Sequence, residues 1–136
     1  RLRPLAYYVS EYLPGPDALS WFRDPAVDWA AKQAMAARIA RLLGQLKAER
    51  LVHGDLKATN FLIGPDGPAL IDLDALRRFR SGGRFARAWR RDLARFVERN
   101  SGMVDRLAKV VYRVKSQGVF WKRFLYLIII AYSRTG

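Results

Sequence analysis

The strongest constraint on the fold is a sharp chain reversal at 64–68 (GPDGP), flanked by two short apolar arms at 61–63 (FLI) and 69–71 (ALI). Pro, Asp and Gly favour tight turns, so this segment predicts a β-hairpin. A symmetric hairpin centred on the aspartate would place Asn60 opposite Asp72. The two ends of the hairpin would then bring an amide and a carboxylate together.

The loop that enters this hairpin, 52–60 (VHGDLKATN), carries further polar groups. Asp55 adds a third oxygen-bearing side chain, and Lys57 could hold a phosphate. Carboxylate and amide oxygens suit Mg²⁺ rather than Zn²⁺. Phosphoryl transfer needs such a set, because a carboxylate must orient the attacking hydroxyl, oxygens must hold the metal, and a cation must offset charge on the transferring group.

Helical periodicity accounts for most of the remaining chain. Asp24-Pro25 supplies a cap and a first-turn proline, and apolar residues then recur at helical spacing, so we expect a helix from there to about Glu49. Three later segments have the same spacing: 85–97, 103–114 and 119–132.

Two segments lie outside the helical pattern. The segment 5–13 (LAYYVSEYL) predicts a strand that stops at 14–16 (PGP), and 81–83 (SGG) predicts a flexible joint. The expected fold class is α+β and mainly helical.

Length and composition narrow the class of protein. A chain of 136 residues has the size of one domain. It has no cysteine, which excludes disulfides and thiolate metal sites. The N-terminus is unlike a signal peptide, and the apolar run 124–132 is far shorter than the roughly 20 residues that span a bilayer. We therefore expect a soluble or surface-bound protein.

The net charge of +13 is confined to one half of the chain. Residues 1–74 carry nine Lys/Arg and nine Asp/Glu, whereas residues 75–136 carry sixteen and three. Such asymmetry indicates an anionic partner, namely nucleic acid, an anionic membrane or a phosphorylated substrate. An arginine-rich surface that is merely solvated is the alternative.

The loop also carries a family resemblance. HGDLKATN is similar to the kinase catalytic loop H-R-D-L-x-x-x-N, and Asp72 follows an apolar strand as the kinase metal-binding Asp does. HGDLKATNFLI followed by IDLDAL most resembles the lipopolysaccharide inner-core kinases, which phosphorylate heptose or Kdo sugars with ATP. The resemblance implies a protein-kinase-like fold, with ATP and Mg²⁺ as cofactors.

The same resemblance assigns roles to residues. Asp55 would be the base or orienter of the sugar hydroxyl, Lys57 the catalytic contact to the γ-phosphate, and Asn60 and Asp72 the metal ligands, with Asn60 also touching the nucleotide. Asp74 could assist the metal, although a solvated acid is the expected role.

Two further residues are assigned supporting positions. The family makes His53 a structural residue of the loop rather than a general base. Asp92 falls on the apolar stripe of its helix, and a buried carboxylate must find donors. We expect it to accept hydrogen bonds from the catalytic-loop backbone, with a salt bridge to an arginine as the alternative.

Gly54 stands where phosphorylation-switched protein kinases have an arginine, and this difference argues against that class of kinase.

The resemblance also divides the chain. Residues 1–15 are expected to be the last strand of an N-terminal lobe and the hinge, and 16–136 the C-terminal lobe. Glu11 and Leu13 would then meet the adenine of ATP. No glycine-rich phosphate loop or V-A-I-K lysine occurs. The chain on its own is therefore expected to show little or no turnover.

The basic half fits an anionic partner of such an enzyme. Lipopolysaccharide inner core is anionic, and seven arginines could steer it: Arg77, Arg78, Arg80, Arg84, Arg87, Arg90 and Arg91. We expect a cytoplasmic protein, with peripheral contact to the inner membrane as a further option through 119–134, unless that segment closes the core.

Other functions stay open on the sequence alone. One alternative is a small-molecule phosphotransferase of the aminoglycoside or choline type, or an atypical protein kinase. Another is a catalytically silent, basic module that binds a membrane. Nucleic-acid binding is not expected, because no reading motif is present. The acceptor sugar is not specified by these residues.

Overall fold

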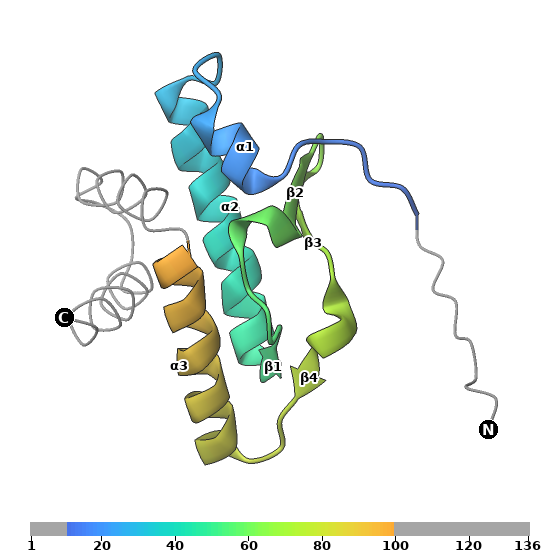
Figure 1. Ribbon diagram of the computed structural model, residues 1–136, viewed down its shortest axis with the longest axis vertical. Coiled ribbons are helices and arrows are strands. Elements are labelled where there is room, and N and C mark those ends of the chain that lie inside the picture. Colours follow the sequence, from blue (N-terminus) through green and yellow to red (C-terminus); the bar gives the residue numbers. More distant parts are fainter. Residues whose placement is uncertain (1–10, 100–136) are drawn as a thin grey trace.

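The computed structural model describes residues 11–99, which form an α+β arrangement of three helices and two small antiparallel sheets (Figure 1). The helices are α1 (Ala18–Arg23), α2 (Trp29–Ala48) and α3 (Gly82–Arg99). The strands are β1 (Leu51–Val52), β2 (Phe61–Gly64), β3 (Gly67–Leu70) and β4 (Arg77–Arg78), with 3₁₀ turns at Ala58–Asn60 and Leu73–Ala75.

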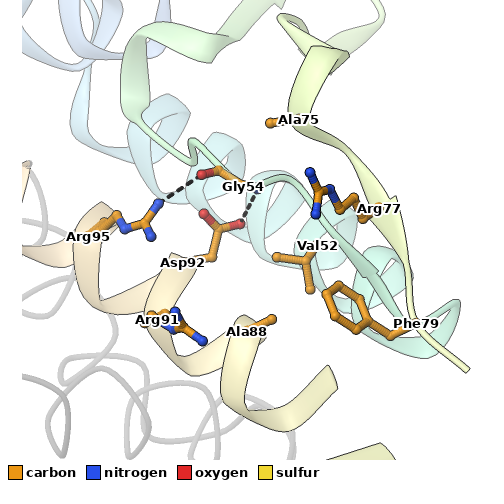
Figure 2. Close-up of a pocket in the computed structure, with 9 residues that line it drawn as sticks. All are labelled: Val52, Gly54, Ala75, Arg77, Phe79, Ala88, Arg91, Asp92 and Arg95. Carbon is orange, nitrogen blue, oxygen red and sulfur yellow. Dashed lines mark hydrogen bonds between the residues drawn. The ribbon is translucent and has the colours of Figure 1, made fainter. Parts of the chain in front are cut away.

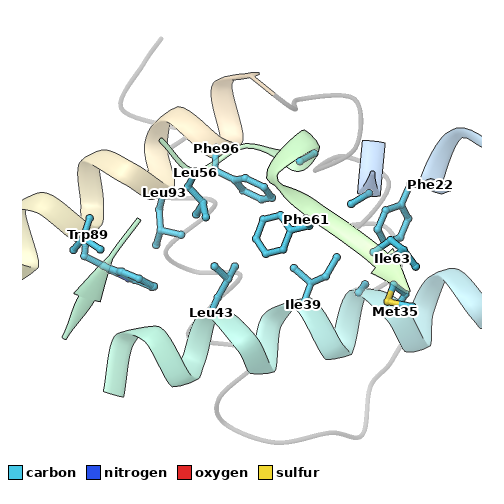
Figure 3. Packing of buried hydrophobic residues seen from close by; sticks show 14 of the residues in the cluster. Phe22, Met35, Ile39, Leu43, Leu56, Phe61, Ile63, Trp89, Leu93 and Phe96 are labelled. Atoms are coloured by element: carbon cyan, nitrogen blue, oxygen red, sulfur yellow. The ribbon is translucent and has the colours of Figure 1, made fainter. Parts of the chain in front are cut away.

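The hydrophobic core lies between α2 and α3, and the loop 52–60 with strand β2 fills the space between them (Figure 3). Phe61 of β2 is fully buried, and its ring meets Phe96 of α3 edge-on with 6.0 Å between the ring centres. Leu56 of the loop and Leu43 of α2 complete the centre. The loop therefore takes part in the core, which fixes its position relative to both helices.

The helix α2 ends where the periodicity predicts, with Glu49 as its C-cap. Its start was predicted too early. The N-cap is Asp28, whose carboxylate accepts a hydrogen bond from the Ala31 N–H at 2.7 Å. Asp24 instead ends the short helix α1 and accepts from the Ala26 N–H at 2.8 Å. Both aspartates have capping chemistry, and the sequence does not show which one begins the long helix.

The hairpin is confirmed, but its predicted register is wrong by one residue. Gly64 pairs with Gly67, so the turn is the two residues Pro65-Asp66 and is not centred on Asp66. Proline suits the first position of such a turn because its φ is fixed near −65°. The position opposite Asn60 is therefore Ile71, whose N–H donates to the Asn60 carbonyl at 2.9 Å.

The expected joint at 81–83 is not a linker, because Gly82 and Gly83 form the first turn of α3. The expected helix over 85–97 lies within α3, and Asp92 is buried on its apolar face as predicted. Of the expected strand at 5–13, residues 5–10 lie outside the described residues, and 11–13 have no regular structure. The expected helices at 103–114 and 119–132 also lie outside them.

Two features that the sequence did not indicate hold the site together. The strand β1 pairs with β4, with Val52 opposite Arg77, so the segments before the loop and after the hairpin are joined. The chain entering α1 runs beside β2, where the Ile63 N–H donates to the Pro16 carbonyl at 2.9 Å. Gly15 makes this approach possible, because a Cβ there would lie 2.2 Å from the Ile63 carbonyl oxygen.

Within residues 11–99, no helix is both long enough and apolar enough to cross a membrane.

Candidate active site

The loop between β1 and β2 is attached to α3 through one buried carboxylate. Asp92 is 2 % exposed, and its two oxygens accept hydrogen bonds from the Gly54 N–H at 3.0 Å and the Leu56 N–H at 3.2 Å. Arg95, one turn later, donates to the Gly54 carbonyl at 2.9 Å. The supporting role predicted for Asp92 is confirmed, and it fixes the backbone on both sides of Asp55.

A buried histidine joins the same loop to the far end of the hairpin. The Nδ1 atom of His53 accepts from the Asp55 N–H at 3.3 Å, so its Nε2 carries the proton and donates to the Ile71 carbonyl at 2.9 Å. Both ring nitrogens are thus occupied by the backbone, and the ring is fully buried. This geometry confirms a structural role and leaves no free nitrogen for a general base.

Asn60 connects the two acids of the site. Its buried amide nitrogen donates to the Asp55 carbonyl at 3.0 Å and lies 3.5 Å from Asp72 Oδ2. Because a carbonyl only accepts, this bond orients the amide and leaves Oδ1 as its free acceptor. Asn60 and Asp72 therefore come together as expected, although they are not directly opposed in the hairpin ladder.

Asp72 reaches Asn60 through an uncommon backbone conformation. Its φ of 59° and ψ of 57° are left-handed, which for a residue other than glycine costs on the order of 1 kcal/mol or more. The residue directly follows the hairpin, and the left-handed step begins the 3₁₀ turn Leu73–Ala75. The strained residue is also the one whose carboxylate faces the loop.

Lys57 places a positive charge between the two carboxylates. Its Nζ lies 2.8 Å from Asp55 Oδ2 and 3.9 Å from Asp72 Oδ2. The second Asp55 oxygen accepts from Arg99 Nη1 at 2.7 Å. These hydrogen bonds, first from Lys57 and then from Arg99, hold the pKa of the Asp55 carboxyl below its usual value.

Arg99 was missed in the sequence, although a signal was present. Arg95 and Arg99 follow Asp92 by three and seven residues, so all three lie on one face of α3. A helix that binds the loop through Asp92 therefore presents both arginines to the same loop.

The remaining predicted residues are not drawn into this cluster. Glu11 is exposed and Leu13 is 40 % exposed, and both precede the point where the chain meets β2. Asp74 is exposed in the 3₁₀ turn after Asp72.

The oxygen ligands at this site suit a hard cation, although they are few. Among the described residues, no group of three or more His, Cys, Asp or Glu side chains is placed to hold a metal ion. The oxygens at the site are the Asn60 amide, the Asp72 carboxylate and the Asp55 carboxylate, and both Asp55 oxygens are paired with Lys57 and Arg99. The Lys57 ammonium lies between the two acids. This chemistry fits Mg²⁺, which takes few protein ligands and completes its shell with water and phosphate.

Comparison with known proteins identifies the kind of chain that carries this loop. The family model described as lipopolysaccharide kinase (Kdo/WaaP) family matches residues 17–115, which include the whole site. A search of curated proteins found no match.

The attachment of the loop to α3 predicts a specific effect of Asp92→Asn. An asparagine can accept from only one of the two N–H groups and directs its own NH₂ at the other. We expect a loss of about 1–3 kcal/mol in the free energy of unfolding. The Gly54 and Leu56 amide protons should exchange with solvent faster, which hydrogen-exchange NMR measures. The control Asp66→Asn alters an exposed turn acid, and equal protection in both variants would contradict this role.

The ion pairs predict the titration of Asp55. Replacing Lys57 with methionine should raise the pKa of Asp55 toward its ordinary value, and Arg99→Gln should do so less, as followed by carboxyl ¹³C NMR. A lowered folded pKa stabilises the protein above the unfolded pKa, and this contribution is lost as the pH falls through the folded value. Asp55→Asn should therefore cost stability at neutral pH and not in acid. An Asp55 titration unaffected by Lys57→Met would contradict the assignment.

Proposed function

The chain belongs to the lipopolysaccharide kinase (Kdo/WaaP) family, and we propose that it carries the catalytic loop of an enzyme that transfers the γ-phosphate of ATP to a sugar hydroxyl of the lipopolysaccharide inner core. The observation that carries this proposal is the convergence of Asp55, Lys57, Asn60 and Asp72 at one end of the hairpin. These side chains come from a loop and a strand end that only the fold brings together.

Asp55 is proposed to hold and orient the acceptor hydroxyl. Its lowered pKa makes it a weak proton acceptor, so positioning is the larger part of its role. The loop backbone on either side is fixed by Asp92, and its own carbonyl is held by Asn60. A carboxylate fixed in this way can align the attacking oxygen without reorganisation during transfer.

Asn60 and Asp72 are proposed to hold Mg²⁺, and Lys57 to contact the γ-phosphate. Mg²⁺ bound with ATP would neutralise charge on the phosphates during transfer. Lys57 is already held by both acids, with Asp55 nearer. Its ammonium lies 3.9 Å from Asp72 Oδ2, so it would offset negative charge on a phosphate bound beside Asp72.

The family match supports further proposals about the lobes of this chain, its contact with adenine and its attraction to the inner core. We propose that 16–136 form the C-terminal lobe of a protein-kinase-like fold and that 1–15 form the end of a smaller lobe with the hinge. Glu11 and Leu13 would then lie beside adenine. The exposed arginines of β4 and α3 would attract the anionic inner core at the cytoplasmic face of the membrane.

A phosphate-transfer assay with the full-length natural protein tests this function, because residues 1–136 alone are expected to show little or no turnover. With γ-labelled ATP, Mg²⁺ and purified inner-core saccharide, we expect label to appear in the saccharide. Asp55→Asn and Asp72→Asn should each lower kcat/KM by at least about 100-fold, as expected for loss of a positioned catalytic carboxylate or a metal ligand.

The control is Asp66→Asn, which removes an acid at the far end of the same hairpin and should keep kcat/KM within about twofold of the original value. Transfer that persists in both site variants would refute the proposed roles. Transfer to an aminoglycoside or a protein in place of the saccharide would refute the proposed substrate class.

A further inference from the structure

A pocket lies beside the loop 52–60, between the β1–β4 pair and α3 (Figure 2). It encloses about 260 Å³. Its walls are the backbone of Gly54, apolar side chains in β1 and next to β4, and charged side chains of α3. The lining residues are Val52, Gly54, Ala75, Arg77, Phe79, Ala88, Arg91, Asp92 and Arg95.

Three arginines surround this hollow, Arg77 from β4 and Arg91 and Arg95 from α3 (Figure 2). The single acid in the wall, Asp92, already uses both oxygens on the Gly54 and Leu56 N–H groups. Among the side chains that the structure describes, none of the three guanidinium groups forms an ion pair with a carboxylate. The pocket therefore holds more positive charge than its own carboxylate offsets.

We propose that this pocket binds a phosphate monoester group. Arginine presents planar, forked donors that match phosphate oxygens, and several guanidinium groups around one hollow favour a compact anion. The volume admits a phosphoryl group together with part of the molecule that carries it. The apolar floor of Val52, Phe79 and Ala88 would contact that attached part.

The pocket is separate from the phosphate-transfer site but shares a wall with it. The Asp55, Asn60 and Asp72 side chains do not line it. Its shared wall is Gly54, which has φ of 89° and lies so close to Ala75 that a Cβ would be 2.8 Å from the Ala75 Cβ. Both backbone groups of Gly54 are held by α3, the N–H by Asp92 and the carbonyl by Arg95.

A bound anion could affect the loop 52–60 through the contact between Arg95 and Gly54. A phosphate bound to Arg91 and Arg95 would hold the arginine that grips the Gly54 carbonyl, one residue before Asp55. Occupancy should therefore order the loop backbone, because fewer arrangements of Arg95 remain. The inference stands on the pocket residues and does not depend on which sugar is phosphorylated.

An NMR titration of the 136-residue chain tests the proposal. Inorganic phosphate and glycerol 3-phosphate are added at constant ionic strength, with acetate as the comparison anion. We expect saturable shifts of the Gly54 and Leu56 amide signals with both phosphates and no saturation with acetate. Arg77→Gln and Arg91→Gln should each weaken binding about tenfold, because each removes a charged donor and leaves the Arg95 contact in place.

The matched controls are Arg84→Gln and Arg87→Gln, which remove the same charge from exposed positions of α3 outside the pocket. They should change the dissociation constant less than twofold. Binding weakened equally by all four variants, or no saturable binding either to the soluble phosphates or to phosphatidic acid vesicles, would overturn the proposal. A phosphatidic acid vesicle arm separates the sources: binding that requires Arg77 and Arg91 in vesicles alone identifies a lipid headgroup, and the same dependence with glycerol 3-phosphate identifies a soluble ligand.

Discussion

The architecture of the site depends on one buried carboxylate. Asp92 accepts hydrogen bonds from the backbone on both sides of Asp55, and those bonds compensate for its burial in the core. The loop thereby becomes part of the packed interior, with Leu56 among the most buried side chains. A polar loop that would otherwise be free to move is fixed against a long helix.

The other contacts of the site build on this attachment. His53 and Asn60 carry the position of the loop across to the end of the hairpin, at Ile71 and Asp72. Lys57 and Arg99 then offset the negative charge that this convergence creates at Asp55. The left-handed backbone at Asp72 is the local cost of bringing its carboxylate to the loop, and the surrounding hydrogen bonds hold it there.

Features of the fold that depend on neighbouring residues were predicted from the sequence. Features that depend on contacts between distant segments were not. The hairpin followed from its turn residues, and the burial of Asp92 followed from the apolar stripe around it. The register failed by one residue because Pro65 takes the first turn position, and Asp24 and Asp28 are equally good caps on chemistry alone. The β1–β4 pairing joins two-residue strands far apart in the chain, which leaves no periodic pattern to detect. Arg99 was detectable only after Asp92 was known to face the loop.

We infer that the Asp92 attachment holds Asp55 beside Asn60 and Asp72, and that Asn60 and Asp72 bind a divalent cation. Paramagnetic broadening of NMR signals by Mn²⁺ measures this directly, because Mn²⁺ shares the oxygen preference of Mg²⁺. If Asn60 and Asp72 bind the cation, saturable broadening will be strongest at the Asn60 side-chain amide and the Asp72 backbone amide, and it will be lost in Asp72→Ala. Broadening centred elsewhere, or unchanged in that variant, would show that these two residues do not form the cation site.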